Sequence, residues 1–354
     1  GSTLLNENLK PERINALEAG VEMYFFNERL GVDLTVYQNT AKDQIITLPT
    51  SSASGYSGQV INGGVIQSKG IEVMLTASII KKENFKWSAF ANFSKGASYV
   101  TELPEGIDQY TTGYARLYTT AENTVFYIAN AGDGGKIGDM YGTGVMKTDE
   151  GRIIYGSNGL PVRDNELRYL GNYNPDFIVG FGNRFEYKGF TLNVLLDWRQ
   201  GGEIISRTKA VGSTSGVLAE TIDGREEGII GDGVVNVGTE SNPVYEENAT
   251  SVSAAEYYNQ FYNRANEESS VYDASYLKIR EIGISYTFPN RWVSKFNIEE
   301  FKIGITARNL FTWTENPHFD PELSAMQGTS QIYGVEDLSY PSSRSYGINV
   351  QFKF

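Results

Sequence analysis

The sequence contains no cysteine, a single histidine, and no run of about 18 or more apolar residues. Without cysteine, a disulfide scaffold and a cysteine-ligated metal or cluster are excluded. Without a long apolar run, no transmembrane helix can form. The one histidine, His318, has no Gly-x-Ser-x-Gly elbow to support a catalytic triad, and no Ca²⁺ loop of the EF-hand type is present. We therefore expect no catalytic residue, no metal site and no cofactor.

Proline is also sparse, with 10 residues, whereas glycine (38) and tyrosine (23) are abundant. This composition favours many strands and turns. The net charge of −13 argues against nucleic-acid binding, which needs a basic face. Much of the excess acid lies in residues 202–273, with 13 Asp and Glu against 4 Lys and Arg, and we expect these residues to form solvated loops.

The clearest pattern is a hairpin from Val179 to Trp198. In its second arm, Phe190, Leu192, Val194, Leu196 and Trp198 share one face, and the other face is mostly polar. The arms are joined only by Lys188 and Gly189, a tight hairpin connection. An apolar band of about 9–11 residues with aromatic ends and a polar opposite face is typical of a transmembrane β-strand.

The same alternation recurs along the chain and predicts nine strands. Besides the two arms of the hairpin, the apolar rows run through Leu17–Phe25, Leu30–Val36, Ile71–Ile79, Phe85–Phe93, Leu277–Phe288, Phe301–Ala307 and Tyr346–Phe354. In Leu277–Phe288 the apolar phase shifts by one residue, which predicts a β-bulge near Glu281.

Short and long connections alternate between these strands. The long ones, at about 38–68, 95–175, 201–273 and 314–339, resemble the external loops of an outer-membrane barrel. Aromatic residues gather at the short-turn ends and predict an interfacial girdle. We therefore expect an all-β, transmembrane antiparallel β-barrel in the bacterial outer membrane.

Nine strands do not close such a barrel. Bacterial single-chain barrels have an even strand number, and an open sheet leaves edge backbone groups unpaired in lipid. We expect further strands to precede this chain, which would then be the C-terminal part of a larger barrel.

Several short motifs support a family resemblance. They are Asn8-Leu9-Lys10-Pro11-Glu12, Ser68-Lys69-Gly70-Ile71-Glu72, Asn174-Pro175-Asp176-Phe177, Asp273-Ala274-Ser275-Tyr276-Leu277-Lys278, Asn309-Leu310-Phe311-Thr312, Asp320-Pro321-Glu322 and Tyr340-Pro341. In this order they resemble SusC/RagA-like TonB-dependent transporters, with Ala274 in place of that family's usual glycine.

The resemblance implies a barrel of about 22 strands plugged by an N-terminal domain, with these nine strands last and the plug absent from this chain. It also implies energised import of oligomeric nutrients, glycan rather than peptide, across the outer membrane. The implied partners are a SusD-like lipoprotein, TonB acting through the missing plug, the remaining N-terminal barrel strands, lipid and the cargo.

Two sets of residues are candidates for contact with cargo or partners. Tyrosines on the long loops suit sugar rings or a partner protein, although each could simply pack its loop: Tyr110, Tyr114, Tyr118, Tyr141, Tyr257, Tyr258 and Tyr262. Polar residues on the inner strand faces are expected to line the lumen: Asp33, Glu72, Asn92, Arg184, Asp197 and Arg199. Of these, Arg184, Asp197 and Arg199 could form a charge ladder along the wall.

Phe354 ends an amphipathic strand and looks like an assembly signal for the outer membrane, while also fitting an ordinary girdle position. Two other functions remain open. A passive barrel or surface adhesin could use its long loops only for binding, and a soluble β-enzyme would have to bury the apolar strand faces in a core.

Overall fold

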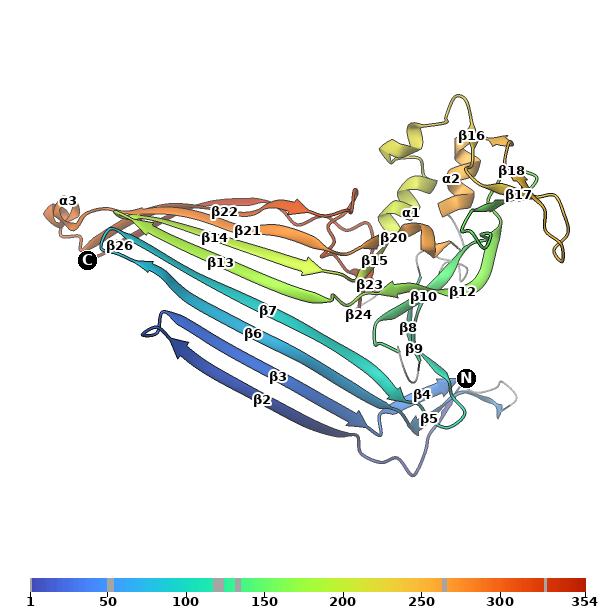
Figure 1. Cartoon of the computed structure of the whole chain (residues 1–354), viewed down its shortest axis with the longest axis horizontal. Helices are drawn as coiled ribbons and strands as arrows, with labels where there is room; N and C mark the ends of the chain where they lie inside the picture. Colours follow the sequence, from blue (N-terminus) through green and yellow to red (C-terminus); the bar gives the residue numbers. More distant parts are fainter. Residues whose placement is uncertain (1, 50–53, 117–123, 131–134, 263–265, 328–329) are drawn as a thin grey trace.

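A large curved antiparallel sheet dominates the computed structural model, which describes residues 2–49, 54–116, 124–130, 135–262, 266–327 and 330–354. Nine strands pair in the order β2, β3, β6, β7, β13, β14, β21, β22, β26 (Figure 1). Their bounds are β2 (Arg13–Phe25), β3 (Leu30–Lys42), β6 (Val65–Lys81), β7 (Phe85–Glu102), β13 (Phe177–Tyr187), β14 (Phe190–Gln200), β21 (Tyr276–Thr287), β22 (Glu300–Trp313) and β26 (Ser345–Lys353). The nine predicted strands are confirmed.

The predicted long connections are too wide at several places. β3 continues to Lys42, β6 begins at Val65 and β7 continues to Glu102, so parts of the expected loops are strand. These extensions are richer in polar residues, which is why the apolar alternation did not reveal them. Their backbones nevertheless stay paired in register, for example Gln67 with Tyr99.

The short and long connections lie at opposite ends of the sheet (Figure 1). The hairpin between β13 and β14 turns at Lys188 and Gly189, which have φ of +45° and +91°. Positive φ at both central residues is the geometry that a two-residue hairpin needs. The C-terminal residues lie at the short-turn end, where α3 (Asn290–Val293) and η4 (Ser294–Phe296) also lie.

The predicted bulge is present in β21. Ile279 pairs with Leu196 and Glu281 with Leu195, so Arg280 is the extra residue. The insertion keeps the apolar rows aligned on both sides of it, with Ile282 opposite Val194 and Ile284 opposite Leu192.

The loop end carries smaller elements that alternation did not predict (Figure 1). Its strands are β1 (Ser2–Leu4), β4 (Ile45–Pro49), β5 (Tyr56–Asn62), β8 (Gln109–Arg116), β9 (Thr124–Asn130), β10 (Asp139–Val145), β11 (Ile154–Tyr155), β12 (Arg163–Asn172), β15 (Glu203–Ser206), β16 (Ile229–Ile230), β17 (Val234–Asn236), β18 (Tyr245–Glu247), β19 (Ser251–Val252), β20 (Val271–Asp273), β23 (Ala325–Gln327), β24 (Ser330–Ile332) and β25 (Val335–Glu336). Its helices are α1 (Arg207–Thr214), η2 (Ala219–Ile222), α2 (Ala254–Tyr262) and η3 (Glu267–Ser270).

The buried hydrophobic clusters lie in this loop region. One contains Met140, Leu170, Ile205 and Val335, and the other contains Ile204, Ala274 and Phe319. Backbone pairing draws them together, since β15 lies between β20 and β25. No helix among the described residues is long and apolar enough to cross a membrane.

The sheet is open. β2 and β26 form its two edges and do not pair with each other among the described residues. The large antiparallel sheet is therefore as expected, while a closed barrel is not present in this chain. Every residue of β2 and β26 is exposed.

Candidate functional site

Four of the predicted lumen residues line one hollow on the polar face of the sheet. Asp33, Glu72, Asn92 and Asp197 surround a space of about 590 Å³. They come from β3, β6, β7 and β14, and their backbones lie in neighbouring registers across the sheet. Strand alternation places them together because facing residues of paired strands share a face.

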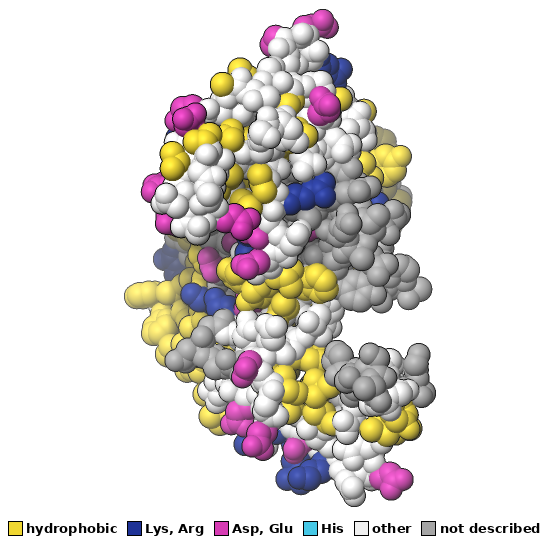
Figure 2. Space-filling model, turned by 90° about the vertical axis from the view of Figure 1, so that its right-hand side faces the viewer, with side chains coloured by type: hydrophobic (Ala, Val, Ile, Leu, Met, Phe, Trp, Pro, Cys, Tyr) yellow, Lys and Arg dark blue, Asp and Glu magenta, His cyan; other side chains and the backbone are white. Residues whose placement is uncertain are grey.

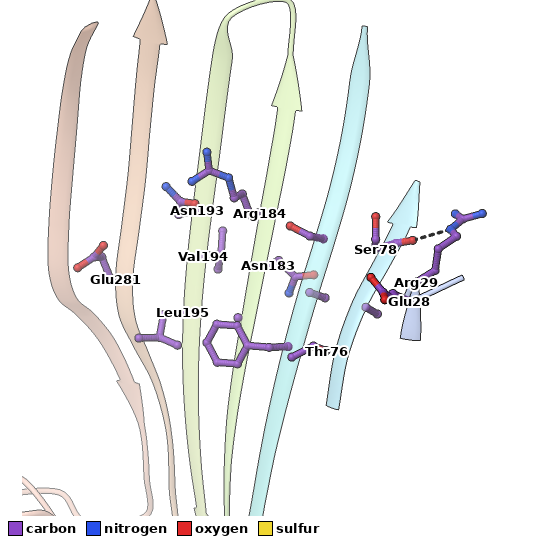
Figure 3. Close-up of a pocket in the computed structure, with 15 residues that line it drawn as sticks. Glu28, Arg29, Thr76, Ser78, Asn183, Arg184, Asn193, Val194, Leu195 and Glu281 are labelled. Carbon is purple, nitrogen blue, oxygen red and sulfur yellow. Dashed lines mark hydrogen bonds between the residues drawn. The ribbon is translucent and has the colours of Figure 1, made fainter. Parts of the chain in front are cut away.

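A second hollow of about 540 Å³ lies on the same face, closer to the short turns. Arg184, Asn193 and Glu281 line it from three strands, and Arg29 at its border donates to the carbonyl of Ser78 at 3.1 Å (Figure 3). Phe90 is the large aromatic ring in this wall. A Cβ on the facing Gly182 would lie 2.1 Å from the Phe90 ring, so only glycine leaves room for that ring.

The predicted charge ladder is wrong. Arg184 pairs with Glu186 at 2.7 Å, Asp197 accepts from Nε of Arg280 at 2.8 Å, and Arg199 donates to the carbonyl of Tyr173 at 2.5 Å. Register explains the failure, since Arg184 lies opposite Asn193 and Asp197 lies opposite Gly180. The side chains of Arg184 and Asp197 are therefore too far apart along the strands to meet.

The apolar face of the sheet is not covered by any other part of the described chain. Ile284 is 50% exposed, Ile305 62% and Ile348 76%, although all three are aliphatic. One polar residue on this face, Asn183, accepts a hydrogen bond from Nε1 of Trp87 at 3.0 Å. The face is therefore mainly apolar, and the amide oxygen of its one half-buried asparagine has a hydrogen-bond partner within the protein, as contact with hydrocarbon requires.

Aromatic rings form a continuous row at the short-turn end of the sheet. Phe190 contacts Tyr286, Tyr286 contacts Phe288, Phe288 contacts Phe301, Phe301 contacts Phe352 and Phe352 contacts Phe354, with ring centroids 4.6–6.3 Å apart. The row crosses β14, β21, β22 and β26. It has the geometry of the interfacial girdle that the sequence predicts.

The loop tyrosines mostly contact other loop residues. Tyr257, Tyr258 and Tyr262 stack among themselves and with Phe261 on α2, and burial raises the pKa of Tyr262. Tyr141 packs edge-on against Tyr169, and the hydroxyl of Tyr110 lies 3.4 Å from the carbonyl of Thr47. Tyr118 and the side chain of Tyr114 lie outside the described residues. The structure thus gives the five described tyrosines contacts within the chain, and a contact with cargo stays a prediction.

One charged cluster was not predicted. Lys278, only 1% exposed, contacts Asp320 at 2.6 Å and also Glu322, while Arg280 bonds to Glu322 at 2.7 Å and to Asp197. Lys278 lies in the Asp273–Lys278 motif of the sequence, and Asp320 and Glu322 lie in the Asp320–Glu322 motif. Because more than 40 residues separate them, no local pattern could show that they meet.

His318 takes part in a loop contact rather than in catalysis. Its Nε2 lies 3.0 Å from Glu220, which also pairs with Lys209. Burial lowers the pKa of His318, and the charge of Lys209 lowers it further. Among the described residues, no group of three or more His, Asp or Glu side chains could hold a metal ion.

The sheet with one exposed apolar face and one polar, hollowed face agrees with what comparison with known proteins finds. The sequence profile of the TonB dependent receptor-like β-barrel matches residues 1–310. The chain belongs to this family. It is a bacterial outer-membrane protein of the SusC/RagA-like type, and the family is not one of enzymes.

Named relatives of this TonB-dependent receptor chain are long proteins. TonB-dependent receptor P3 of Formosa agariphila is 25% identical over 374 residues, which cover 99% of this chain and 35% of that protein. TonB-dependent receptor SusC of Bacteroides thetaiotaomicron is 21% identical and is matched over 98% of this chain and 32% of its own length. The chain therefore spans about a third of the length of these relatives.

A solved structure shares the fold. The RagAB peptide importer in its "closed-closed" state superposes with a TM-score of 0.67 at 20% identity, covering 97% of this chain and 35% of the matched chain. Its "open-open" state gives the same TM-score. At this identity, the likeness shows the fold of the chain and not its cargo.

Proposed function

We propose that this TonB-dependent receptor chain forms part of the wall of an outer-membrane transporter that imports an oligomeric nutrient. The observation that carries the proposal is the difference between the two faces of the sheet. One face exposes aliphatic rows and an aromatic row, while the other carries two hollows lined by charged and polar side chains. A polar wall behind a lipid-facing surface is what a transmembrane passage needs.

The whole transporter would contain more than this chain. The open edges at β2 and β26 have backbone groups that must be paired in hydrocarbon, and further barrel strands would pair them. In this proposal the barrel has about 22 strands, and a plug that responds to TonB fills it. A SusD-like surface lipoprotein would lie against the long loops, whose acidic side chains are spread over that end of the molecule (Figure 2).

The cargo we propose is a glycan rather than a peptide. The hollows present hydroxyl and amide groups, including Thr35, Ser94, Asn92 and Asn193, which can exchange hydrogen bonds with sugar hydroxyls. The ring of Phe90 adds a flat apolar surface among them. Sugar rings have polar edges and apolar C–H faces, so this mixture suits them.

Uptake measured in cells tests the proposal. The full-length protein is expressed with its surface lipoprotein, and uptake of a fluorescent oligosaccharide pool and of a fluorescent peptide pool is measured with and without TonB. We expect TonB-dependent uptake of the oligosaccharides. Uptake of peptides alone would overturn the cargo class, and binding without TonB-dependent uptake would favour a passive barrel or adhesin.

Two phenylalanines on opposite faces of β7 provide a matched pair for the same assay. Phe90 lies on the polar face, and Phe93 lies on the apolar face, where it packs against Phe177. Phe90→Ala should reduce oligosaccharide uptake per assembled molecule several-fold. Phe93→Ala should reduce the amount of assembled protein but leave uptake per molecule unchanged.

A further inference from the structure

The cluster of Lys278, Arg280, Asp197, Asp320 and Glu322 joins the wall of the sheet to the loop between β22 and β26. Lys278 lies opposite Asp197 in the register of β21 and β14, so its side chain is on the polar face with Asp197. The bulge inserts Arg280 just beyond it, and Arg280 bonds to Asp197 as well. Any carboxylate that reaches these two cations must come to the polar face of the sheet.

Asp320 and Glu322 do reach them. Asp320 contacts Lys278 at 2.6 Å and Glu322 bonds to Arg280 at 2.7 Å, while the hydroxyl of Tyr276 lies 3.2 Å from Glu322. Burial raises the pKa of Asp320, and the ammonium of Lys278 and the hydroxyl of Ser342 lower it by more, so the carboxyl stays ionised. The loop is therefore held by charged groups on the inner side of the sheet.

Further bonds fix the two ends of the same loop. Asn316 donates to the carbonyl of Asp273 at 2.9 Å, and Thr314 donates to the carbonyl of Ser275 at 3.0 Å. At the far end, the backbone and hydroxyl of Ser342 donate to Asp320. The Asp273–Lys278 motif and the Asp320–Glu322 motif thus form one structural unit.

This attachment shapes a hollow of about 300 Å³ at the base of the long loops. Arg199 of β14, Tyr173 just before β13 and Glu203 just after β14 line one side of it. Pro321, Leu323, Ser324 and Tyr333 line it from the loop, and the ring of Tyr333 stacks on that of Tyr173 at 5.7 Å. The far part of the loop is held separately, because the hydroxyl of Tyr127 donates to the carbonyl of Tyr333 at 2.7 Å and the backbone N–H of Ile205 donates to the carbonyl of Gly334 at 2.8 Å. The charged attachment therefore acts on the near part of the loop side, from Asp320 to Ser324.

We propose that Lys278 and Arg280 are positioning residues that keep the Asp320–Pro321–Glu322 segment against the polar face at the outer mouth, and that import requires this position of the loop. The claim that import requires this loop position rests on the proposed function. The claim that Lys278 and Arg280 hold the loop in place does not depend on it. The two residues are not proposed to touch the cargo.

The absence of cysteine from this chain allows the loop position to be measured directly. Ser324→Cys places a single thiol of this chain at the half-buried loop side of the hollow. The rate at which a polar maleimide modifies it in the full-length protein on cells reports how often the loop leaves the wall. Asn158→Cys, in an exposed loop outside the cluster, controls for reagent access.

Four variants separate the loss of a charge in the cluster from a change in side-chain shape. Arg280→Met removes one cation, Arg280→Lys keeps its charge, and Glu322→Gln removes one of the loop's two carboxylates in the cluster with almost no change in shape. Glu281→Gln is the control, because Glu281 pairs with Arg308 at 2.8 Å on neighbouring strands and does not contact the loop. Arg280→Met and Glu322→Gln should raise the Ser324→Cys labelling rate by about tenfold, whereas Arg280→Lys and Glu281→Gln should leave it near the parent value.

Uptake of the fluorescent oligosaccharide and peptide pools is measured in the same cells, per assembled molecule. The proposal expects uptake to fall in Arg280→Met and Glu322→Gln and to be retained in Arg280→Lys. An unchanged labelling rate in Glu322→Gln would overturn the positioning, and raised labelling with normal uptake would overturn its requirement for import. If the parent protein takes up neither pool, the proposed function fails, while the labelling rates still decide where the loop lies.

Discussion

Ile205 in the loop region is fully buried, whereas Ile305 in the sheet is 62% exposed. The two residues have the same side chain, and they illustrate how the two regions differ. The loop region packs its apolar residues into small buried clusters around Met140 and Ile204. The sheet turns its apolar rows outward and keeps its polar residues on the inner face.

This comparison shows that each region suits a different solvent. Water drives the loop clusters together, because burying apolar surface there is favourable. The exposed rows of the sheet would be costly in water but are neutral in hydrocarbon, provided that the backbone is paired. A change that harms one region should therefore leave the other largely intact.

The largest expected effect is on membrane assembly and comes from a charge on the apolar face of β14. Val194→Arg should place a cation near the middle of the bilayer at a cost of about 2–4 kcal/mol, and assembled protein should be lost. Asn193→Arg, one residue away on the polar face, should be tolerated. The amount of folded protein in outer-membrane fractions measures both, and equal amounts for the two variants would contradict the assignment of the faces.

The loop clusters should respond in the opposite way. Met140 has no exposed surface, and Met140→Ala should weaken its cluster by about 2–5 kcal/mol. We expect faster proteolysis of the long loops with a normal amount of assembled protein. A loss of assembled protein as severe as that of Val194→Arg would show that the two regions are not separable.

A smaller effect should come from Glu267, the first residue of η3, whose buried side chain reaches β10. One of its oxygens accepts from the backbone and hydroxyl of Thr143 at 2.7 Å, and the other has no hydrogen-bond partner among the described residues. Burial raises the pKa of Glu267, while the bonds from Thr143 lower it by less. The folded loop therefore favours the protonated form.

A raised pKa in the folded state gives stability that is complete below the unfolded pKa and is lost as the pH rises through the folded pKa. The protection of the amides of residues 139–145 against hydrogen exchange, corrected for the intrinsic rise of the exchange rate with pH, should thus fall as the pH rises above the ordinary range of a glutamate. Glu267→Gln keeps the bonds from Thr143 and cannot ionise, so it should remove this dependence and add about 1–3 kcal/mol at the alkaline end. The control is Glu268→Gln, because Glu268 forms a more exposed ion pair with Lys147 and this variant should keep the pH dependence. If Glu268→Gln also lost the pH dependence, the effect would not belong to Glu267.

Sequence alternation predicted the sheet well, because the period-two pattern within a single strand shows which of its side chains share a face. The bulge at Arg280 was found in the same way, as a one-residue shift of the apolar phase in a single strand. The ends of the strands were harder to predict. Residues such as Gln67 and Tyr99 pair beyond the apolar band, where no alternation marks them.

The loop region could not be predicted because its contacts join distant segments. Ile205 pairs with Val335, and Lys278 meets Asp320, across gaps that no local pattern spans. The loop tyrosines were visible as aromatic residues, but the stacking of Tyr257 on Phe261 depends on the helix α2 that carries them. The residues Asp33, Glu72, Asn92 and Asp197 could be placed on one face from the sequence because they belong to strands, and they line one hollow; that this hollow is part of a lumen stays a prediction.

The most direct test of the central claim measures which solvent each residue of β14 meets in the membrane. Cysteines are introduced one at a time from Thr191 to Trp198 in the full-length protein, and each carries a nitroxide label. The account predicts an alternation of period two, with oxygen, which concentrates in lipid, reaching labels at Leu192, Val194 and Leu196 and a polar nickel chelate excluded from them. Equal access of oxygen at neighbouring positions, or oxygen access at Asn193 and Leu195 instead, would contradict it.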